Sequence, residues 1–521
     1  MVSQRVQVEN GTISANEASP DPGNRSYQMA LVGVCLEALK RQNLPRLSQL
    51  SSSASELSCT ALLILLELLQ GPYSDRLAKL ELELDCLARL TGTQLKYLDA
   101  ALQIHLLNVT FAALKLRILQ VAHHPTEMDV RQSAQDNTGS LKLSYHGELD
   151  ETTFPTVPAL PLAQLLRALR SGLSAPEARS TVKQWIQFLI DCLPLFGREI
   201  YQVLIPMTEL LCREVRDAFD SLRAAFVGST TQSGPSPDHA ILSLLEGLEQ
   251  MLATAHDQLV ADQLKEGALK SPENRQGFFG SMFSADSSLP RTPTANDRLT
   301  VILSFQDAVR ICYTIWSFGN LKEPTTQYLN FSKLSLKYST HRLRSKARKM
   351  LEHLFRAEPL ECLEALIGLW RHREDDSSRN EPTSFDLFAA LLHVLDGSQP
   401  RTTLPVIFKS LYTRTNPGAL ESSEASSMTV NLRATDIISF MLVYVSTLED
   451  DAVNEVWIDS LTFLRDISAN YLPHRSILPG LVRFAAILSQ KLGNTTFGDQ
   501  KKYRRDISVR PINSTLCDSM S

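Results

Sequence analysis

Residues 241–259 read ILSLLEGLEQMLATAHDQL, and they indicate the fold class of the chain. Apolar side chains recur there at alternating intervals of four and three residues: Ile241, Leu245, Leu248, Leu252, Ala255 and Leu259. This spacing places them on one face of a long α-helix. Outward from this stretch the same periodicity continues, with a second stripe from Leu343 to Leu354 and further predicted helices at 384–396, 402–412, 433–447, 451–469 and 474–492.

No block of the chain alternates strands with helices. Helices of ~10–20 residues joined by short turns over several hundred residues are typical of repeat proteins. The sequence therefore predicts an all-α protein, an irregular α-solenoid of HEAT or armadillo type with disordered linkers. Trp316, Trp370 and Trp457 lie on apolar helix faces, so we expect them to be buried.

Composition narrows the class of function. The chain has 521 residues, of which 43% are hydrophobic and 21% charged, so it can bury a large core. At roughly 150 residues per domain, this length fits three or four domains or one extended repeat array. The formal net charge of -5 excludes a global electrostatic attraction to nucleic acid. The eight cysteines include no CxxC pair, so we interpret them as small buried apolar side chains in a reducing compartment.

Polar segments divide the chain into helical blocks. We expect a disordered N-terminus at 1–26, helical hairpins at 27–121, an acidic linker at 122–158, a helical block at 159–266, a Ser/Pro/Gly linker at 267–295, a C-terminal helical solenoid block at 296–505 and an unstructured tail at 506–521. The polar N-terminus predicts no signal peptide. The most apolar run, Leu62–Leu69, is too short to cross a bilayer. These features predict a soluble intracellular protein, and any contact that it makes with a membrane would be peripheral.

The sequence offers no catalytic motif. It lacks GxxxxGK[ST], HExxH, GxSxG and a GxGxxG after a strand. Isolated histidines and cysteines are better explained as solvated or buried side chains than as ligands, bases or nucleophiles: His105, His123, His124, His393, Cys312 and Cys362. We therefore expect no enzyme, no metal and no cofactor.

One surface feature is a concentration of positive charge on a predicted helix. Four cations and a histidine recur at intervals of four and three residues, and we call them the basic stripe: Arg342, Lys346, Lys349, His353 and Arg356. Arg344 and Arg348 flank the apolar face on its other side. Three interpretations stay open: a solvated helix flank, a docking site for phosphoinositide headgroups or an acidic partner, and a nucleic-acid contact. Nucleic acid is the least favoured because no aromatic residues alternate with the charges.

A second feature is an apolar cluster inside a polar linker. Residues 277–283 read GFFGSMF, and we name their large apolar members the phenylalanine cluster: Phe278, Phe279, Met282 and Phe283. Either this loop packs back onto the helices, which is the commoner fate of such clusters, or it is an exposed apolar anchor.

Several long segments resemble one protein family. They are GFFGSMFS (277–284), NDRLTVILSFQDAVRICYTIW (296–316), TTLPVIFKSLYTRTNPGALE (402–421), LEDDAVNEVWIDSLTFLRDI (448–467), PHRSILPGLVRFAAIL (473–488) and NTTFGDQKKYRR (494–505). Over about 277–505 the chain resembles the Dopey family of Golgi and endosome trafficking proteins. Members of that family are much longer, and residues 507–521 depart from the family pattern.

The resemblance implies a non-catalytic peripheral membrane scaffold in endosome-to-Golgi and intra-Golgi vesicle traffic and organelle organisation, tied to development in filamentous fungi. It implies a location in the cytosol and on the cytosolic face of Golgi and endosomal membranes. The implied partners are a large Golgi scaffold related to Arf guanine-nucleotide exchange factors and anionic lipids such as phosphatidylinositol 4-phosphate; self-association is a further expectation. The alternative function is a nuclear-transport-like or nucleic-acid adaptor that uses the basic helix 342–356.

Overall fold

The computed structural model describes residues 27–41, 51–71, 82–91, 95, 98–123, 160–227, 237–269, 293–318, 331–376, 384–395, 400–421 and 424–495. Within these ranges the regular secondary structure is helical, and no strand occurs. The prediction of an all-α fold is therefore confirmed. The chain divides into two compact units, Met1–Gln164 and Leu165–Ser521.

The first unit contains four described helices: α2 (Tyr27–Arg41), α3 (Ser51–Gln70), α5 (Leu82–Arg89) and α7 (Ala100–His123). Helix α3 packs against α2 and α7, and α5 packs against α7. The apolar side chains that meet there are almost fully buried, among them Leu62, Leu65 and Leu106. An ion pair of 2.5 Å between Arg117 and the buried Glu83 adds a polar contact between α7 and α5.

Helix α7 contains an apolar stretch that is longer than the Leu62–Leu69 run. Its stretch Ala100–Leu119 is long and apolar enough to cross a membrane by length and composition alone, unlike the shorter Leu62–Leu69 run. Of that stretch, 44% is buried inside the first unit, where α3 and α5 cover it. This burial is what a core helix of a folded domain requires.

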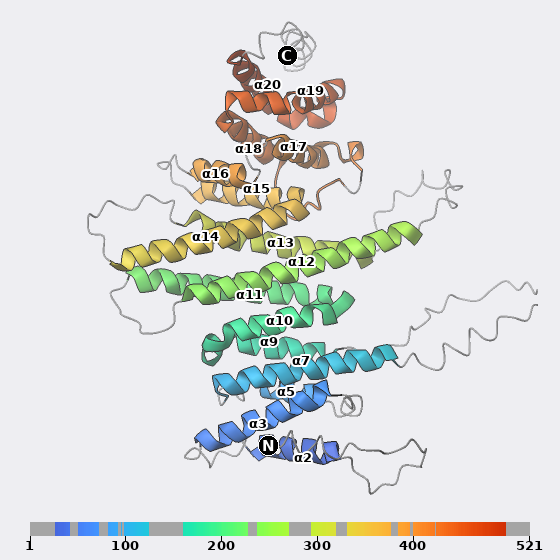
Figure 1. Ribbon diagram of the computed structural model, residues 1–521. Helices are drawn as coiled ribbons and strands as arrows, with labels where there is room; N and C mark the ends of the chain where they lie inside the picture. The colour runs from blue at the N-terminus through green and yellow to red at the C-terminus, as the bar shows by residue number, and fades with distance from the viewer. Residues whose placement is uncertain are drawn as a thin grey trace, which may run out of the picture. The chain divides into compact units, whose positions relative to one another are not determined.

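The second unit is a longer succession of helices. They are α9 (Leu162–Ser174), α10 (Val182–Phe196), α11 (Ile200–Val227), α12 (Pro237–Leu269), α13 (Pro293–Ser317), α14 (Phe331–Ala357), α15 (Pro359–Asp376), α16 (Ser384–Leu395), α17 (Pro400–Thr415), α18 (Ala434–Thr447), α19 (Val453–Ala469) and α20 (Leu478–Gly493). Most of them contact the next one or two helices in chain order, as α11 does with α12 and α13 (Figure 1). Such nearest-neighbour packing defines a helical-repeat solenoid.

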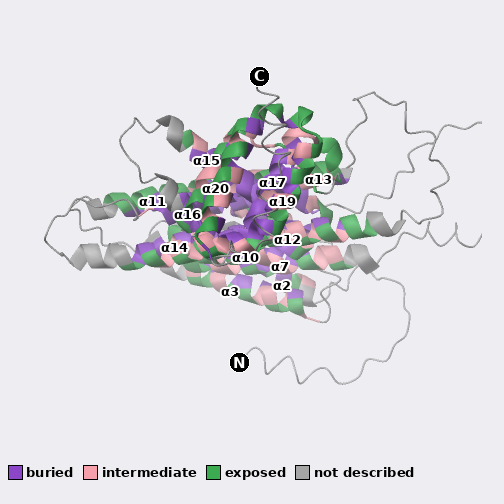
Figure 2. Ribbon diagram, turned by 90° about the horizontal axis from the view of Figure 1, so that it is seen from above, coloured by how far each residue is buried: buried purple, intermediate pink, exposed green. Residues whose placement is uncertain are grey.

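The predicted apolar stripes form the core of this unit. All six residues of the 241–259 stripe are at most 1% exposed, and Trp316, Trp370 and Trp457 are buried, as predicted. Figure 2 shows buried residues gathered where the helices pack together and exposed residues along their outer sides. Helix α12 continues to Leu269 and α13 begins at Pro293, so each enters the predicted 267–295 linker by three residues.

A buried ion pair connects two helices of the solenoid. Arg414 on α17 contacts both carboxylate oxygens of Glu364 on α15, at 2.6 and 2.8 Å, and their side chains are only 5% and 0% exposed. Ser410 and Ser426 each donate a hydrogen bond to the same carboxylate, at 2.6 and 2.8 Å. The charge of Glu364 is thus neutralised and its oxygens are satisfied, as a buried carboxylate requires.

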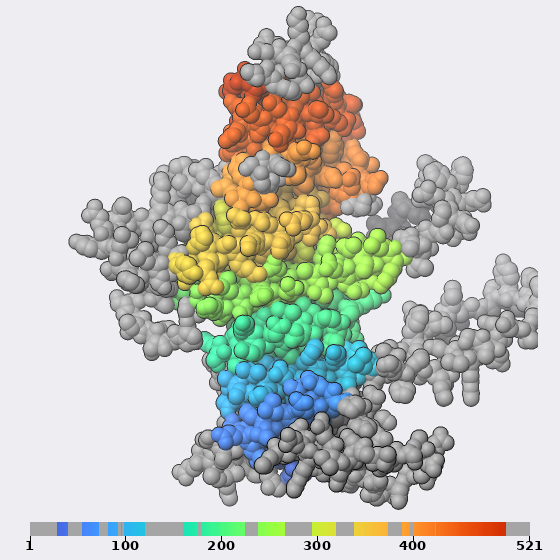
Figure 3. Space-filling view, in the orientation of Figure 1, coloured from blue at the N-terminus to red at the C-terminus, as the bar shows by residue number. Residues whose placement is uncertain are grey.

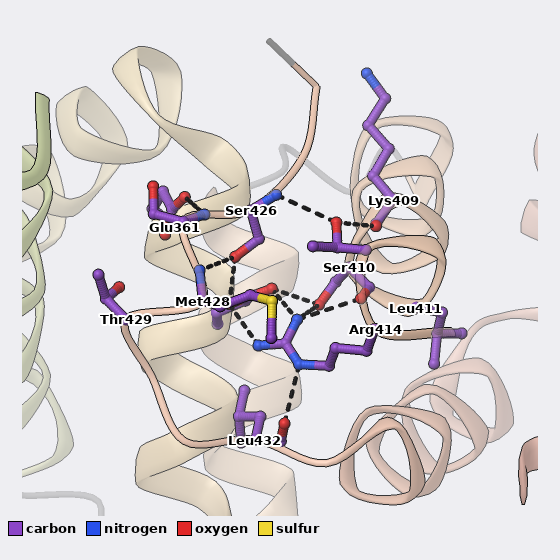
Figure 4. Close-up of polar contacts among 12 residues, drawn as sticks. Glu361, Lys409, Ser410, Leu411, Arg414, Ser426, Met428, Thr429 and Leu432 are labelled. Carbon is purple, nitrogen blue, oxygen red and sulfur yellow. Dashed lines mark hydrogen bonds and ion pairs between the residues drawn. The ribbon is translucent and has the colours of Figure 1, made fainter. Parts of the chain in front are cut away.

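The same cluster fastens the segment that leads to α18 (Figure 4). The Arg414 guanidinium donates to the carbonyl oxygen of Leu432 at 2.9 Å, and the Ser427 amide donates to the Glu361 carboxylate at 2.7 Å. Met428 lies between Ser427 and Leu432 in the chain. Its φ of 53° is a left-handed conformation that is uncommon for a residue other than glycine. Because α15 and α17 hold it on both sides, the segment is part of the folded unit.

Candidate interaction site

Helix α14 presents the basic stripe from a fixed support. Its apolar face consists of Leu343, Ala347, Met350, Leu351 and Leu354, which are at most 4% exposed. This face packs against α12, α13, α15 and α16. Figure 3 shows α12 and α14 as adjoining bands on one face of the second unit. The core beneath this face therefore fixes how α14 is rotated about its axis.

Two cations of the stripe are engaged by acidic residues of α12. Arg342 lies 3.7 Å from the buried Asp238, and Lys346 lies 2.5 Å from Glu249. The Nδ1 atom of His353 is 2.5 Å from the other oxygen of Glu249. These three contacts join α14 to α12 and stabilise the packing of the two helices. Arg342 and Lys346 are thus part of an intramolecular contact.

The two flanking arginines are also occupied. The Arg344 guanidinium lies 5.5 Å from the centre of the Trp316 ring, a cation–π distance, and burial lowers its pKa. Arg348 forms an ion pair of 2.9 Å with Glu352 on the same helix. Each of these two arginines thus has a partner within the described part of the chain.

Lys349 and Arg356 differ from the other cations of the basic stripe in their exposure and in their lack of ion pairs among the described residues. Both are exposed, and neither forms an ion pair with any residue in the described ranges. They are seven residues apart, so they lie on the same side of α14, about two turns from one another. Among the described residues, the basic stripe thus has two parts: Arg342, Lys346 and His353, which contact α12, and Lys349 and Arg356, which we call the free half of the stripe.

The acidic partners on α12 were missed by the sequence analysis, although a signal existed. Asp238 and Glu249 are eleven residues apart, as are Arg342 and His353 on α14. Eleven residues make about three helical turns, so each pair shares one helix face. Two faces of opposite charge and equal spacing can pair once the fold brings their helices together, as it does for α12 and α14.

The predicted phenylalanine cluster, Phe278, Phe279, Met282 and Phe283, lies outside the described residues. So do the predicted terminal segments 1–26 and 506–521 and residues 124–158 of the acidic linker. Both interpretations of the cluster, packed loop and exposed anchor, stay predictions.

Four buried cysteines of the described residues lie in apolar surroundings. Burial raises the pKa of the Cys86 and Cys212 thiols to about 12, and it raises the pKa of Cys312 and Cys362 as well. Such thiols stay protonated and unreactive at neutral pH. Among the described residues, no group of three or more His, Cys, Asp or Glu side chains could hold a metal ion.

Comparisons with protein families agree with this architecture. The family model described as the DOP1 TPR domain matches residues 77–253, and the one described as DOP1 C-terminal matches residues 440–516. The first match lies entirely before residue 277, so the likeness extends further toward the N-terminus than the resemblance over 277–505. TPR units are helical repeats, in agreement with the stacked helices of the second unit.

Curated relatives extend the match over most of the chain. Protein dop1 of Emericella nidulans is 38% identical over 456 residues, which cover 86% of this chain and 24% of the relative. Protein DOP1 of Saccharomyces cerevisiae is 27% identical over 361 residues, which cover 65% of this chain and 20% of the relative. This chain thus spans a quarter or less of the length of these two proteins. No solved structure matches the chain significantly. The two domain matches and the long alignments with both relatives show that the chain belongs to the DOP1, or Dopey, family.

Proposed function

We propose that this chain is a non-enzymatic scaffold in vesicle traffic between endosomes and the Golgi and within the Golgi, recruited from the cytosol to the cytosolic face of these membranes. Membership of the Dopey family and the helical-repeat fold support this role, because stacked helices offer extended surfaces for partners. The observation that carries the membrane contact is the free half of the basic stripe: Lys349 and Arg356 project, without partners among the described residues, from a helix whose apolar face is fixed.

The proposed lipid is an anionic one such as phosphatidylinositol 4-phosphate, and the proposed protein partner is a large Golgi scaffold related to Arf guanine-nucleotide exchange factors. Each cation near an anionic membrane contributes ~1 kcal/mol, so Lys349 and Arg356 together contribute ~2 kcal/mol. A millimolar association already requires about 4 kcal/mol, so these two residues cannot hold the protein on a membrane alone. Lys349 and Arg356 therefore require a second contact between the protein and the membrane or a membrane-bound partner. Two linked weak contacts together bind much more tightly than either one alone.

The test compares two double variants of the full chain. Lys349→Glu/Arg356→Glu reverses the free charges without touching the contacts of Arg342 and Lys346. Arg475→Glu/Arg483→Glu makes the same charge change at exposed sites that also form no ion pair among the described residues. We expect the first variant to lose cosedimentation with phosphatidylcholine vesicles containing phosphatidylinositol 4-phosphate, while the control variant binds like the unchanged chain.

Helicity by circular dichroism confirms that both variants fold. If both bind these vesicles as well as the unchanged chain, the free half of the stripe is only solvated helix surface. If the unchanged chain instead binds RNA or DNA with a steep salt dependence and ignores the vesicles, the alternative function as a nucleic-acid adaptor is favoured.

A further inference from the structure

A cavity of about 540 Å³ lies between α14, α15, α16 and α17. Six apolar side chains from these four helices line most of it: Phe355, Leu363, Leu392, Val394, Leu395 and Val406. It is partly open to solvent, and Val394 in its wall is 38% exposed. The volume falls within the range of about 300–1,000 Å³ that is usual for ligand sites.

The two charged side chains that line this cavity differ in whether they have an ion-pair partner. Glu352 and Arg356, one turn apart on α14, both line it. Glu352 is neutralised by Arg348 at 2.9 Å, whereas Arg356 has no ion-pair partner among the described residues. The cavity therefore combines an apolar interior with one free positive charge at its wall. Lys349, on the same side of α14 and about two turns away, extends this positive edge beyond the cavity.

An apolar cavity with a positive edge favours a ligand that carries apolar and acidic side chains at helical spacing. A groove bounded by helices accepts the apolar face of an amphipathic helix, with anchor residues at i, i+3, i+4 and i+7. Carboxylates beside those anchors would meet Arg356 and, two turns along, Lys349. We infer that this cavity binds an acidic amphipathic helix of a partner protein. The inference goes beyond the proposed membrane contact, because it concerns a protein ligand and the apolar interior of the cavity, although both use Lys349 and Arg356.

The experiment selects peptides from a displayed library of randomised helical sequences on the full-length chain. Val394→Glu, which places a charge in the wall of the cavity, serves for counter-selection. We expect the enriched sequences to carry large apolar residues at i, i+3, i+4 and i+7 flanked by Asp or Glu. Enrichment that is equal on the Val394→Glu chain, or that yields no acidic amphipathic sequences, would overturn the inference.

An enriched peptide is then titrated against four variants by fluorescence anisotropy. Val394→Glu and Arg356→Glu should each weaken binding by about tenfold or more, since contacts at the centre of an interface dominate its affinity. Their matched controls are Val482→Glu, at a side chain 40% exposed on α20, and Arg483→Glu, and these should leave the affinity unchanged. Equal losses in cavity and control variants would contradict the site.

The same variants distinguish binding of a peptide in the cavity from binding of a lipid there and from the membrane contact. If a fluorescent long-chain fatty acid binds the unchanged chain, is lost in Val394→Glu and displaces every selected peptide, the cavity is a lipid site and the inference fails. Val394→Glu leaves Lys349 and Arg356 in place, so it should keep vesicle binding while it loses the peptide. Failure of the peptide and failure of the vesicle experiment are therefore separate results.

Discussion

Replacing Arg414 by Met removes the positive charge that neutralises Glu364 inside the second unit. The two side chains are 5% and 0% exposed, and the guanidinium contacts both carboxylate oxygens. Methionine keeps the unbranched apolar stem of arginine but ends before the guanidinium, so the change removes the charge and its hydrogen bonds. Glu364 keeps the hydrogen bonds from Ser410 and Ser426, but the carbonyl oxygen of Leu432 loses its donor.

Removing one partner of a buried ion pair leaves an uncompensated charge and destabilises a protein by about 3–5 kcal/mol. We expect Arg414→Met to lower the free energy of unfolding of the second unit by this amount. The matched control is Arg310→Met, because Arg310 pairs with Asp307 at 2.6 Å with side chains 48% and 37% exposed. An exposed pair of this kind contributes about 0–1 kcal/mol.

The assay is urea unfolding followed by tryptophan fluorescence. All four tryptophans, Trp185, Trp316, Trp370 and Trp457, lie in the second unit, so the signal reports that unit alone. Hydrogen exchange adds a local measurement: the Ser427 amide, bonded to Glu361, should exchange faster in Arg414→Met. If Arg414→Met costs no more than Arg310→Met and exchange is unchanged, the cluster does not hold the segment before α18.

Three further predictions follow from the packing of single residues. Trp316→Ala should lower the free energy of unfolding by about 3–5 kcal/mol in a urea titration followed by circular dichroism, and a loss below ~1 kcal/mol would show that α13 is peripheral. Gly172→Ala should cost about 1–3 kcal/mol because the new methyl group would lie 2.3 Å from the Trp185 ring, whereas Gly33→Ala meets open space and should not lower the melting temperature. Burial lowers the pKa of His474, so the unfolded state binds its proton more readily and stability should fall as pH drops below about 6.5; His474→Gln should flatten this part of the stability–pH curve, and an unchanged slope would contradict it.

The fold was predictable because its signal is local. The apolar spacing from Ile241 to Leu259 can be recognised from residues that are close together in the sequence. The predicted helices at 433–447 and 451–469 agree with α18 and α19 to within two residues. Pro206 lies inside α11, which runs from Ile200 to Val227, so tertiary packing maintains a helix there despite the missing amide donor.

The site was predictable only in part, because its character depends on contacts between distant residues. The periodicity identified the cations of α14 but could not show that Asp238 and Glu249, about a hundred residues earlier, neutralise two of them. The Glu364–Arg414 pair and the cavity beside Arg356 are likewise products of the tertiary packing of helices. A single sequence shows which faces are charged, whereas the pairing of those charges requires the fold.

The most direct test of the proposed function is where the full-length chain resides in living cells. A fluorescently tagged chain, imaged together with Golgi and endosomal membrane markers, should coincide with these markers on their cytosolic side. A uniform cytosolic signal, or accumulation in the nucleus, would contradict the account of this chain as a scaffold of endosome-to-Golgi traffic.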